Sequence, residues 1–380
     1  MDFAPTEEQR LLRESAAAFV RRHCPREAVR RWDREGEFPE TLHAAMVEAG
    51  FPAMVVPAAH GGLGSPMQDC AIVYEELARP SMDIASRIAL IAWGAAILGD
   101  FASEEMRRAV LPRVARGEAK LSFSLTEPQS GSDAASLRTR ARRDGGDWVV
   151  SGQKLFSTGA HARDNHIILV ARTDPDAPKH KGISLLLVPN DAPGITMRRL
   201  DTVGRHIIGL NEIYFDEVRL PGSALIGEEN QGWRYVTRHL ERERITIAAY
   251  NLGCALATLE DAVAYARERE QFGQPIGRFQ ALAHALADAA TEVEAARWLT
   301  ALAAWRYDQG LPCAREASMA KLHASEMLVR LTTLGMQVLG GHAYTYDHDM
   351  QRYWRDARNS TVGGGTSQIQ RQLIAREIGL

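Results

Sequence analysis

Hydroxyl side chains and a glycine gather in the stretch TEPQSGSD, residues 126–133. Thr126 and Ser132 each offer a hydroxyl, and Gly131 between them would let backbone amides approach a ligand closely. This combination suits a ligand with a polar edge or a phosphate group. The same octapeptide is also typical of an ordinary polar turn after a strand, so on its own it marks only a candidate binding site.

A second candidate lies near the C-terminus, in STVGGGTSQIQR, residues 360–371. Glycine inside a regular element costs stability, so the run from Gly363 to Gly365 needs a physical reason. Either the chain only turns there, or a ligand comes very close to bare backbone. An amphipathic segment follows directly, and the choice between the two depends on what the rest of the sequence offers.

The elements that must position these stretches fall into three zones. Residues 1–120 predict helices, the first of them with Thr6 as its N-cap. Residues 121–225 carry short β-rich runs, DWVVSG, HIILVAR, GISLLLV and LNEIYFDEVRL, separated by Gly, Pro, Asn and Asp. Residues 226–380 predict long alanine- and leucine-rich helices. We therefore expect an α+β multidomain chain with an N-terminal helical domain, a middle β domain and a C-terminal helical domain.

Length, composition and charge exclude several function classes. The 380 residues are 45% hydrophobic and 24% charged, which is typical of a globular protein of two or three domains. A net charge of -3 gives no electrostatic footprint for nucleic acid or an anionic membrane. The longest apolar run, Ile88 to Gly99, is too short to span a bilayer and predicts a buried helix. The charged N-terminus lacks the apolar core of a signal peptide, so we expect a cytoplasmic protein with no membrane partner.

Motifs for several other chemistries are missing from the sequence. It contains no strand–GxGxxG–helix unit, no GxxxxGK[ST], no HExxH and no GxSxG. Cys24, Cys70, Cys254 and Cys313 have no paired metal or redox spacing and fit a reducing cytosol. The segment YDHDM, residues 346–350, predicts a solvated polar loop rather than a metal site.

Four stretches, in this order along the chain, resemble the acyl-CoA dehydrogenase family of flavoproteins. They are LSFSLTEPQSGSD (121–133), SGQKLFSTGA (151–160), YAREREQFGQPIGRFQ (265–280) and the stretch 336–371, which includes QVLGG and the glycine run. The resemblance covers essentially the whole chain. It implies a β-barrel-like middle domain, a C-terminal four-helix bundle, FAD as cofactor and an acyl-CoA thioester as substrate. It also implies an electron-transfer flavoprotein as electron acceptor and a homotetramer built as a dimer of dimers.

The resemblance assigns three groups of residues to FAD. The first group lines the flavin ring and comprises Phe123, Leu125, Thr126, Gly131, Ser132, Phe156, Ser157 and Thr158. The second group would contact FAD across a subunit boundary and comprises Arg269, Gln271, Phe272, Phe279, Gln280, Gln337, Val338, Gly340 and Gly341. The third group is Thr366 and Gln368. Phe156 stands where many family members carry tryptophan, and the Thr158 hydroxyl would reach the reactive flavin nitrogen.

The catalytic base is not where many family members have it. They carry a glutamate at the position of Gly364, and glycine cannot move a proton. In another branch of the family the base is a glutamate early in the first long helix of the last domain, directly before an arginine; here it is Glu243, before Arg244. On a helix, Glu243 would share a face with Ile247 and Tyr250, where desolvation would raise its pKa and strengthen it as a base. The alternative is a surface glutamate paired with an arginine.

In the family, the residue at this position also binds the thioester carbonyl through its backbone, and Gly364 is expected to keep this part of the role. Its backbone N–H would donate to the thioester carbonyl, and the neighbouring glycines would let the ligand approach without a Cβ clash. The space left by the missing side chain would admit a branched or polar acyl group. The substrate contacts that the resemblance implies are Ser132, Glu241, Arg244 and Gly365.

The expected reaction is FAD-dependent α,β-dehydrogenation of an acyl-CoA, in which Glu243 takes the α proton and the flavin accepts the β hydride. Three alternatives stay open. The sequence is also similar to crotonobetainyl-CoA reductase, where the same base and flavin would serve an enoyl-CoA reductase. A flavin monooxygenase or oxidase on the same fold would consume oxygen, and a non-catalytic acyl-binding flavoprotein would need no base.

Overall fold

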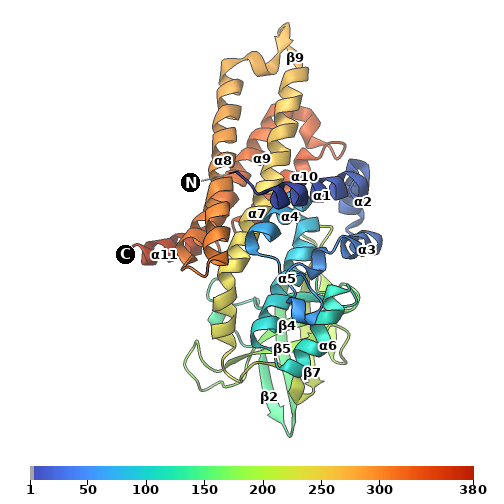
Figure 1. Cartoon of the computed structure of the whole chain (residues 1–380), viewed down its shortest axis with the longest axis vertical. Coiled ribbons are helices and arrows are strands. Elements are labelled where there is room, and N and C mark those ends of the chain that lie inside the picture. Colours follow the sequence, from blue (N-terminus) through green and yellow to red (C-terminus); the bar gives the residue numbers. More distant parts are fainter. Residues whose placement is uncertain (1–3) are drawn as a thin grey trace.

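The computed structural model of the chain describes residues 4–380, which form a helical part, a β-sheet and a second helical part (Figure 1). The N-terminal helices are α1 (Glu7–His23), α2 (Arg26–Glu35), α3 (Glu40–Glu48), α4 (Met67–Ala78), α5 (Met82–Phe101) and α6 (Glu104–Ala115). Thr6 caps α1 as predicted, because its hydroxyl accepts from the Gln9 N–H while the Gln9 side chain accepts from the Thr6 N–H.

α5 contains the longest apolar run, and most of its residues are buried, as predicted. Among residues 4–380 it is the one helix long and apolar enough to cross a membrane, but 72% of its most apolar window is buried inside the protein. Gly94 lets α5 approach the sheet closely, since a Cβ there would lie 2.7 Å from the Leu121 side chain. α5 is therefore a core helix that joins the N-terminal part to the sheet.

The middle part is an eight-stranded sheet in the order β6-β7-β3-β2-β4-β5-β8, with β1 pairing β4 in parallel. The strands are β1 (Lys120–Ser124), β2 (Arg140–Asp144), β3 (Asp147–Thr158), β4 (Asn165–Arg172), β5 (Ile183–Pro189), β6 (Ile195–Arg199), β7 (Leu210–Leu220) and β8 (Leu225–Ile226). The four β-rich runs of the sequence form β3, β4, β5 and β7. Alternate residues of these strands, Trp148, Val150, Ile213 and Phe215 among them, bury a core that belongs to the sheet alone.

The C-terminal part consists of three long helices and two short ones. They are α7 (Gly232–Glu268), α8 (Gln280–Asp308), α9 (Ala314–Leu339), α10 (Met350–Ser360) and α11 (Ser367–Glu377). A hairpin of β9 (Glu270–Gln271) and β10 (Gln274–Pro275) joins α7 to α8 at the end farthest from the sheet (Figure 1). α7 packs against α9 and against α4 and α5, so it ties the two helical parts together.

The segment 346–350 differs in part from the solvated loop that the sequence predicted. Asp349 is only 2% exposed. It forms ion pairs with Arg26, Arg30 and Arg352 at 2.8, 2.9 and 2.9 Å. The carboxylate tolerates burial because these guanidinium groups replace its lost hydration. In the part of the chain that the structure describes, no group of three or more His, Cys, Asp or Glu side chains could hold a metal ion, and all four cysteines are buried and free.

Candidate active site

Glu243 lies in the first third of α7, on the face that carries Ile247 and Tyr250. Its carboxylate makes no hydrogen bond or ion pair with any residue from 4 to 380, so the paired surface glutamate considered above is not what the structure shows. Burial raises the pKa of Glu243 to about 7, although the nearby charges of Arg244 and Lys321 lower it. Its side chain is nevertheless partly accessible. A carboxyl group with this pKa can take up and release a proton near neutral pH.

The glycine run forms a tight turn between α10 and α11 that presses against this face of α7. Gly364 and Gly365 have φ values of +62° and +80°, the left-handed region that favours glycine. A Cβ at Gly364 would lie 2.2 Å from Ile247 Cδ1 and 3.5 Å from Glu243 Oε1. The structure thus brings the two residues together, 121 positions apart in sequence, and the glycines are needed both for the turn and for the close approach.

The Gly364 N–H is free to serve a ligand. The neighbouring amides are used, since Gly363 N–H donates to the Asn359 carbonyl and Ser367 N–H donates to the Thr361 carbonyl. The Gly364 N–H donates to no acceptor among residues 4–380. Gly364 thus has an unused amide, and its Cβ position lies 3.5 Å from Glu243 Oε1. An amide donor and a carboxylate base are the two groups that an enolising carbonyl compound requires.

Lys321, on α9, holds the carbonyl groups of this turn, a role that the sequence did not predict. Its ammonium is fully buried and donates to the Ser360 carbonyl at 2.8 Å and to the Gly365 carbonyl at 2.7 Å. Burial lowers the pKa of Lys321 to about 8, although Glu243 raises it. Gln370 adds a second support, because its side-chain amide donates to the Gly364 and Gly365 carbonyls at 3.1 Å each. Lys321 and Gln370 therefore hold the carbonyls of Gly364 and Gly365, and no acceptor among residues 4–380 takes up the Gly364 N–H.

The predicted flavin-lining residues of β3 lie on an irregular part of that strand. The pairing of β3 with β7 shifts register between Lys154 and Ser157, and Phe156 there has a φ of +59°. The bulge leaves the Phe156 ring 53% exposed, and Thr158 is partly accessible as well. The Ser157 hydroxyl is instead buried against Ser124 Oγ at 2.7 Å, so Ser157 offers a ligand only its backbone.

The TEPQSGSD turn is held by a buried ion pair that the sequence did not single out. Glu127 accepts from Lys154 Nζ at 2.8 Å and from the N–H groups of Arg138 and Thr139 at 2.6 and 2.9 Å. Burial raises the pKa of Glu127, but Lys154 and these donors outweigh it and lower the pKa to about 2. Gly131 and Ser132 lie exposed at the tip of this turn. A Cβ at Gly131 would meet nothing within 4 Å, so ligand access there is open.

The remaining residues predicted near the flavin on β1 lie in the same region. Phe123 and Leu125 are partly buried, and the Phe123 ring lies 4.3 Å from Trp93 of α5. Thr126 is partly accessible at the end of β1. Thr366 caps α11, since its hydroxyl accepts from the Ile369 N–H at 3.2 Å.

Two of the predicted substrate contacts flank Glu243 on α7. Glu241 accepts from the Cys313 thiol at 3.2 Å. Arg244 is 8% exposed, and burial lowers its pKa. Gln368, predicted to contact the flavin, is exposed on the first turn of α11.

The predicted cross-subunit residues form a separate pocket of about 590 Å³ at the hairpin end of α7. Its lining includes Arg269 and Gln271 together with Val338, Gly340 and Gly341. Four residues of that predicted group do not belong to its lining: Phe272, Phe279, Gln280 and Gln337. Phe272 is 94% exposed and meets Phe279 edge to face, with 6.1 Å between the ring centres.

This pocket is far from Glu243. Arg269 follows Glu243 by 26 residues along α7, which corresponds to about 39 Å of helix. Figure 1 shows the hairpin and the sheet at opposite ends of the molecule. One dinucleotide cannot contact both places within a single chain.

The residues near the sheet fit a flavin nucleotide. The exposed Phe156 ring can lie against an isoalloxazine, and the accessible hydroxyls of Thr126, Ser132 and Thr158 can meet its polar edge. The open backbone at Gly131 suits a pyrophosphate. The hydroxyls of Thr126, Ser132 and Thr158 make no hydrogen bond with any residue from 4 to 380, whereas the Ser157 hydroxyl is paired with Ser124.

Comparisons with known proteins agree with this geometry. Family models match residues 6–118 (acyl-CoA dehydrogenase, N-terminal domain), 122–218 (middle domain) and 230–379 (C-terminal domain). The probable acyl-CoA dehydrogenase YngJ of Bacillus subtilis is 37% identical over 381 residues, covering 100% of both chains. The solved structure of butyryl-CoA dehydrogenase from Megasphaera elsdenii is similar with a TM-score of 0.94 and 29% identity over 100% of both chains.

A third similar structure is the FAD complex of PigA, with a TM-score of 0.94 and 26% identity over 100% of both chains. It points to the same cofactor as the exposed aromatic ring and hydroxyls near the sheet. Fold, site geometry and three matching domain models lead to one conclusion: the chain is an FAD-dependent oxidoreductase that belongs to the acyl-CoA dehydrogenase family.

Proposed function

We propose that the protein oxidises an acyl-CoA thioester to its α,β-unsaturated product, with Glu243 as the base. The observation that carries this proposal is the 3.5 Å between Glu243 Oε1 and the Cβ position of residue 364. Glu243 thus delivers its carboxylate to the place that a side chain at position 364 would occupy. The carboxylate also has the raised pKa that proton abstraction near neutral pH requires.

Each chemical task in this proposal has its own residue. The N–H of Gly364 donates to the thioester carbonyl and stabilises the negative charge that develops on its oxygen. Glu243 removes the α proton and is protonated as a result. FAD, when bound, would accept the hydride from the β carbon. Ile247 and the buried face of α7 limit the hydration of the carboxylate, which keeps it a strong base.

The separation of the two predicted FAD contact regions supports a cofactor shared between subunits. Residues near the sheet would hold the flavin ring, and the hairpin pocket of a second chain would hold the rest of the dinucleotide. The family resemblance places this pairing within a homotetramer, a dimer of dimers. An electron-transfer flavoprotein would take the electrons from the reduced enzyme.

The test is anaerobic mixing of the FAD-loaded enzyme with a panel of acyl-CoA esters, followed by the flavin absorbance. Bleaching of the absorbance on addition of a saturated acyl-CoA, with formation of the enoyl-CoA, supports the proposal. No bleaching with any acyl-CoA, together with rapid oxidation of a reduced electron donor by an enoyl-CoA, would reverse the direction of the reaction. Fast reoxidation of the reduced enzyme by oxygen would identify an oxidase.

The pH dependence of the reaction should report Glu243. Because the base must be deprotonated, we expect kcat/KM for the acyl-CoA to rise about tenfold per pH unit below the pKa of about 7 and to level off above it. The free energy of unfolding should change in the opposite direction to the activity, falling as the pH rises. The folded-state pKa lies above the ordinary value of 4.5, so ionising Glu243 costs stability as the pH rises through this window. A pH profile that is flat from pH 5 to 8 would contradict the assignment.

Lys321 is a positioning residue, and its charge should affect the pH at which this activity profile rises. Its charge lowers the pKa of Glu243, so in Lys321→Met the profile should move to higher pH and the activity at pH 7 should fall about tenfold. Lys321→Arg keeps the charge and should move the profile less. A merely structural effect would lower activity equally at all pH values, and that outcome would remove Lys321 from the proton chemistry.

A further inference from the structure

Arg87 of α5 is a buried cation that no carboxylate pairs with. Its side chain is 3% exposed, and it forms no ion pair or hydrogen bond with any other residue that the structure describes, from 4 to 380. Burial lowers the pKa of Arg87 to about 10, although Glu40 and Asp83 raise it, so the guanidinium is charged at neutral pH. Its central carbon lies 4.7 Å from the centre of the Phe38 ring, a contact that replaces only part of the lost hydration.

The two carboxylates that raise this pKa are bound to other donors. Asp83, one turn earlier on α5, pairs with Arg205 and accepts from two backbone N–H groups at 2.9 and 3.1 Å. Glu40 pairs with Lys120 at 3.2 Å. If Asp83 turned toward Arg87, Arg205 would become an unpaired buried charge in its place, because it is itself only 5% exposed.

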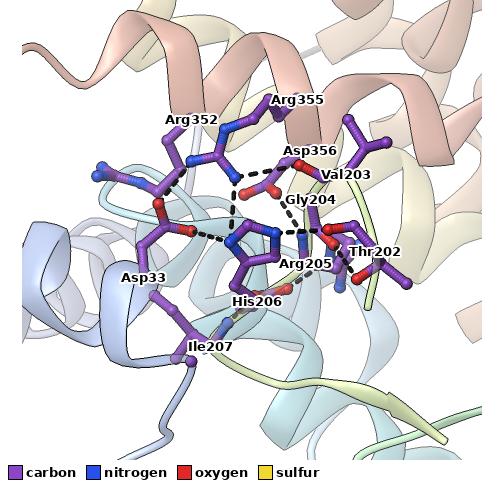
Figure 2. A network of polar contacts seen from close by, with 12 residues as sticks. Asp33, Thr202, Val203, Gly204, Arg205, His206, Ile207, Arg352, Arg355 and Asp356 are labelled. Carbon is purple, nitrogen blue, oxygen red and sulfur yellow. Dashed lines mark hydrogen bonds and ion pairs between the residues drawn. The ribbon is translucent and has the colours of Figure 1, made fainter. Parts of the chain in front are cut away.

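The loop that carries Arg205, residues 202–207, is fixed in its position. Figure 2 shows this loop held by polar contacts against α2 and α10. The Arg205 N–H donates to Asp356 of α10 at 2.6 Å. Since these contacts come from elements far apart in the chain, the loop keeps Asp83 occupied and leaves Arg87 without a partner.

The Arg87 guanidinium lies against the backbone at the end of β3. A Cβ at Gly159 would lie 3.2 Å from Arg87 Nη1 and 3.7 Å from its Cζ. Gly159 has a φ of +63°, and its N–H donates to the Gly209 carbonyl at 2.9 Å. It directly follows Thr158, whose hydroxyl is expected to reach the reactive flavin nitrogen. The unpaired charge is therefore next to the backbone of the expected flavin site.

The nearby histidines do not change this charge. Burial lowers the pKa of His161, in the loop after β3, to about 4, and the charges of Arg199 and Arg87 lower it as well. Burial also lowers the pKa of His43 to about 4, together with the charges of Lys120 and Arg87. Both imidazoles are neutral at pH 7, so Arg87 keeps its positive charge beside them.

We propose that Arg87 raises the reduction potential of the bound flavin. A hydride carries two electrons and one proton, so its transfer from the acyl β carbon adds one negative charge to the flavin, while the α proton goes to Glu243. A buried cation nearby stabilises this added charge, because little water lies between the two charges to screen them. Such a role gives a physical reason for a buried charge that costs stability. The inference rests on a flavin beside Thr158 and does not depend on which residue is the base.

The test is the midpoint potential of the flavin in the holoenzyme, measured by anaerobic reductive titration against a reference dye, without any acyl-CoA. In Arg87→Met the equilibrium constant for reduction should fall about tenfold, which corresponds to about 30 mV for two electrons. Arg87→Lys keeps the charge and should lower the potential less. Arg108→Met removes an equal charge from the exposed face of α6, and this matched control should leave the potential unchanged.

Stability separates this electrostatic role from a structural one. Because Arg87 is unpaired, its replacement by an apolar methionine should not lower the melting temperature. A variant that loses FAD on purification can be titrated as apoprotein with oxidised and with dithionite-reduced FAD, since the ratio of the two dissociation constants reports the same shift in potential.

Two results would overturn the inference. One is an unchanged potential in Arg87→Met, which, with a large fall in melting temperature, would assign Arg87 to the fold alone. The other is an equal fall in potential in Arg108→Met, which would show an effect of net charge rather than of position. Neither result depends on whether an acyl-CoA reduces the flavin, so this inference and the proposed reaction can fail separately.

Discussion

Glu243→Gln should lower the rate of flavin reduction by an acyl-CoA about 10²- to 10⁴-fold, the range that removal of a general base costs. Glutamine has nearly the same shape but cannot accept the α proton. The Gly364 N–H and the flavin-lining residues stay in place, so substrate and FAD should both remain bound. Stopped-flow absorbance under anaerobic conditions measures the rate, and the flavin spectrum of the purified variant measures cofactor content.

The stability of this variant is informative as well. Because the Glu243 carboxylate is desolvated and unpaired, replacing it with a neutral amide should not lower the melting temperature at pH 8. Glu260→Gln, an exposed position on the same helix that pairs with Arg79, is the matched control and should keep full activity. If Glu243→Gln retains more than about a tenth of the activity, proton removal belongs to another group.

Gly364→Ala should lower the same rate about 100-fold, although alanine adds only one methyl group. The new Cβ would lie 2.2 Å from Ile247 Cδ1, so either Ile247 or the turn must move. A shift of about 1 Å in the position of the amide relative to Glu243 is enough for such a loss. The positive φ of 62° adds a strain of about 1–2 kcal/mol, so the melting temperature should fall too.

Two controls separate the steric clash with Ile247 from the backbone strain at position 364. Gly146→Ala, in the open turn between β2 and β3, introduces a Cβ that meets nothing within 4 Å and should change neither activity nor stability. Gly364→Ala combined with Ile247→Ala removes the clash but keeps the strained backbone, so part of the activity should return. Full activity of the single variant Gly364→Ala would show that no ligand depends on this turn.

The pairing of Glu243 with Gly364 could be predicted because each sequence signal was local. The family motif marked the glycine, and the helical period placed Ile247 and Tyr250 on the face of Glu243. The pKa shift followed from that face being apolar, and burial does raise the pKa as predicted. Helices, strands and their order were readable for the same reason, since each depends on a period within a short segment.

Residues that act through tertiary contacts were missed or misread. Lys321 is one lysine on an amphipathic helix, and nothing near it in sequence indicates the Ser360 and Gly365 carbonyls that it holds. Asp349 was predicted to be solvated because its neighbours are polar, but Arg30, 319 positions earlier, helps to bury it. Such pairings depend on how helices from different parts of the chain pack.

The length of α7 has a consequence for how this sequence can diverge. The length of the helix sets the distance between the Glu243 carboxylate near one end and the hairpin pocket at the other. One residue gained or lost between them would turn everything beyond it by about 100° and shift it by about 1.5 Å. Between positions 243 and 269, gaps and insertions should therefore be tolerated less well than substitutions in descendants of this chain.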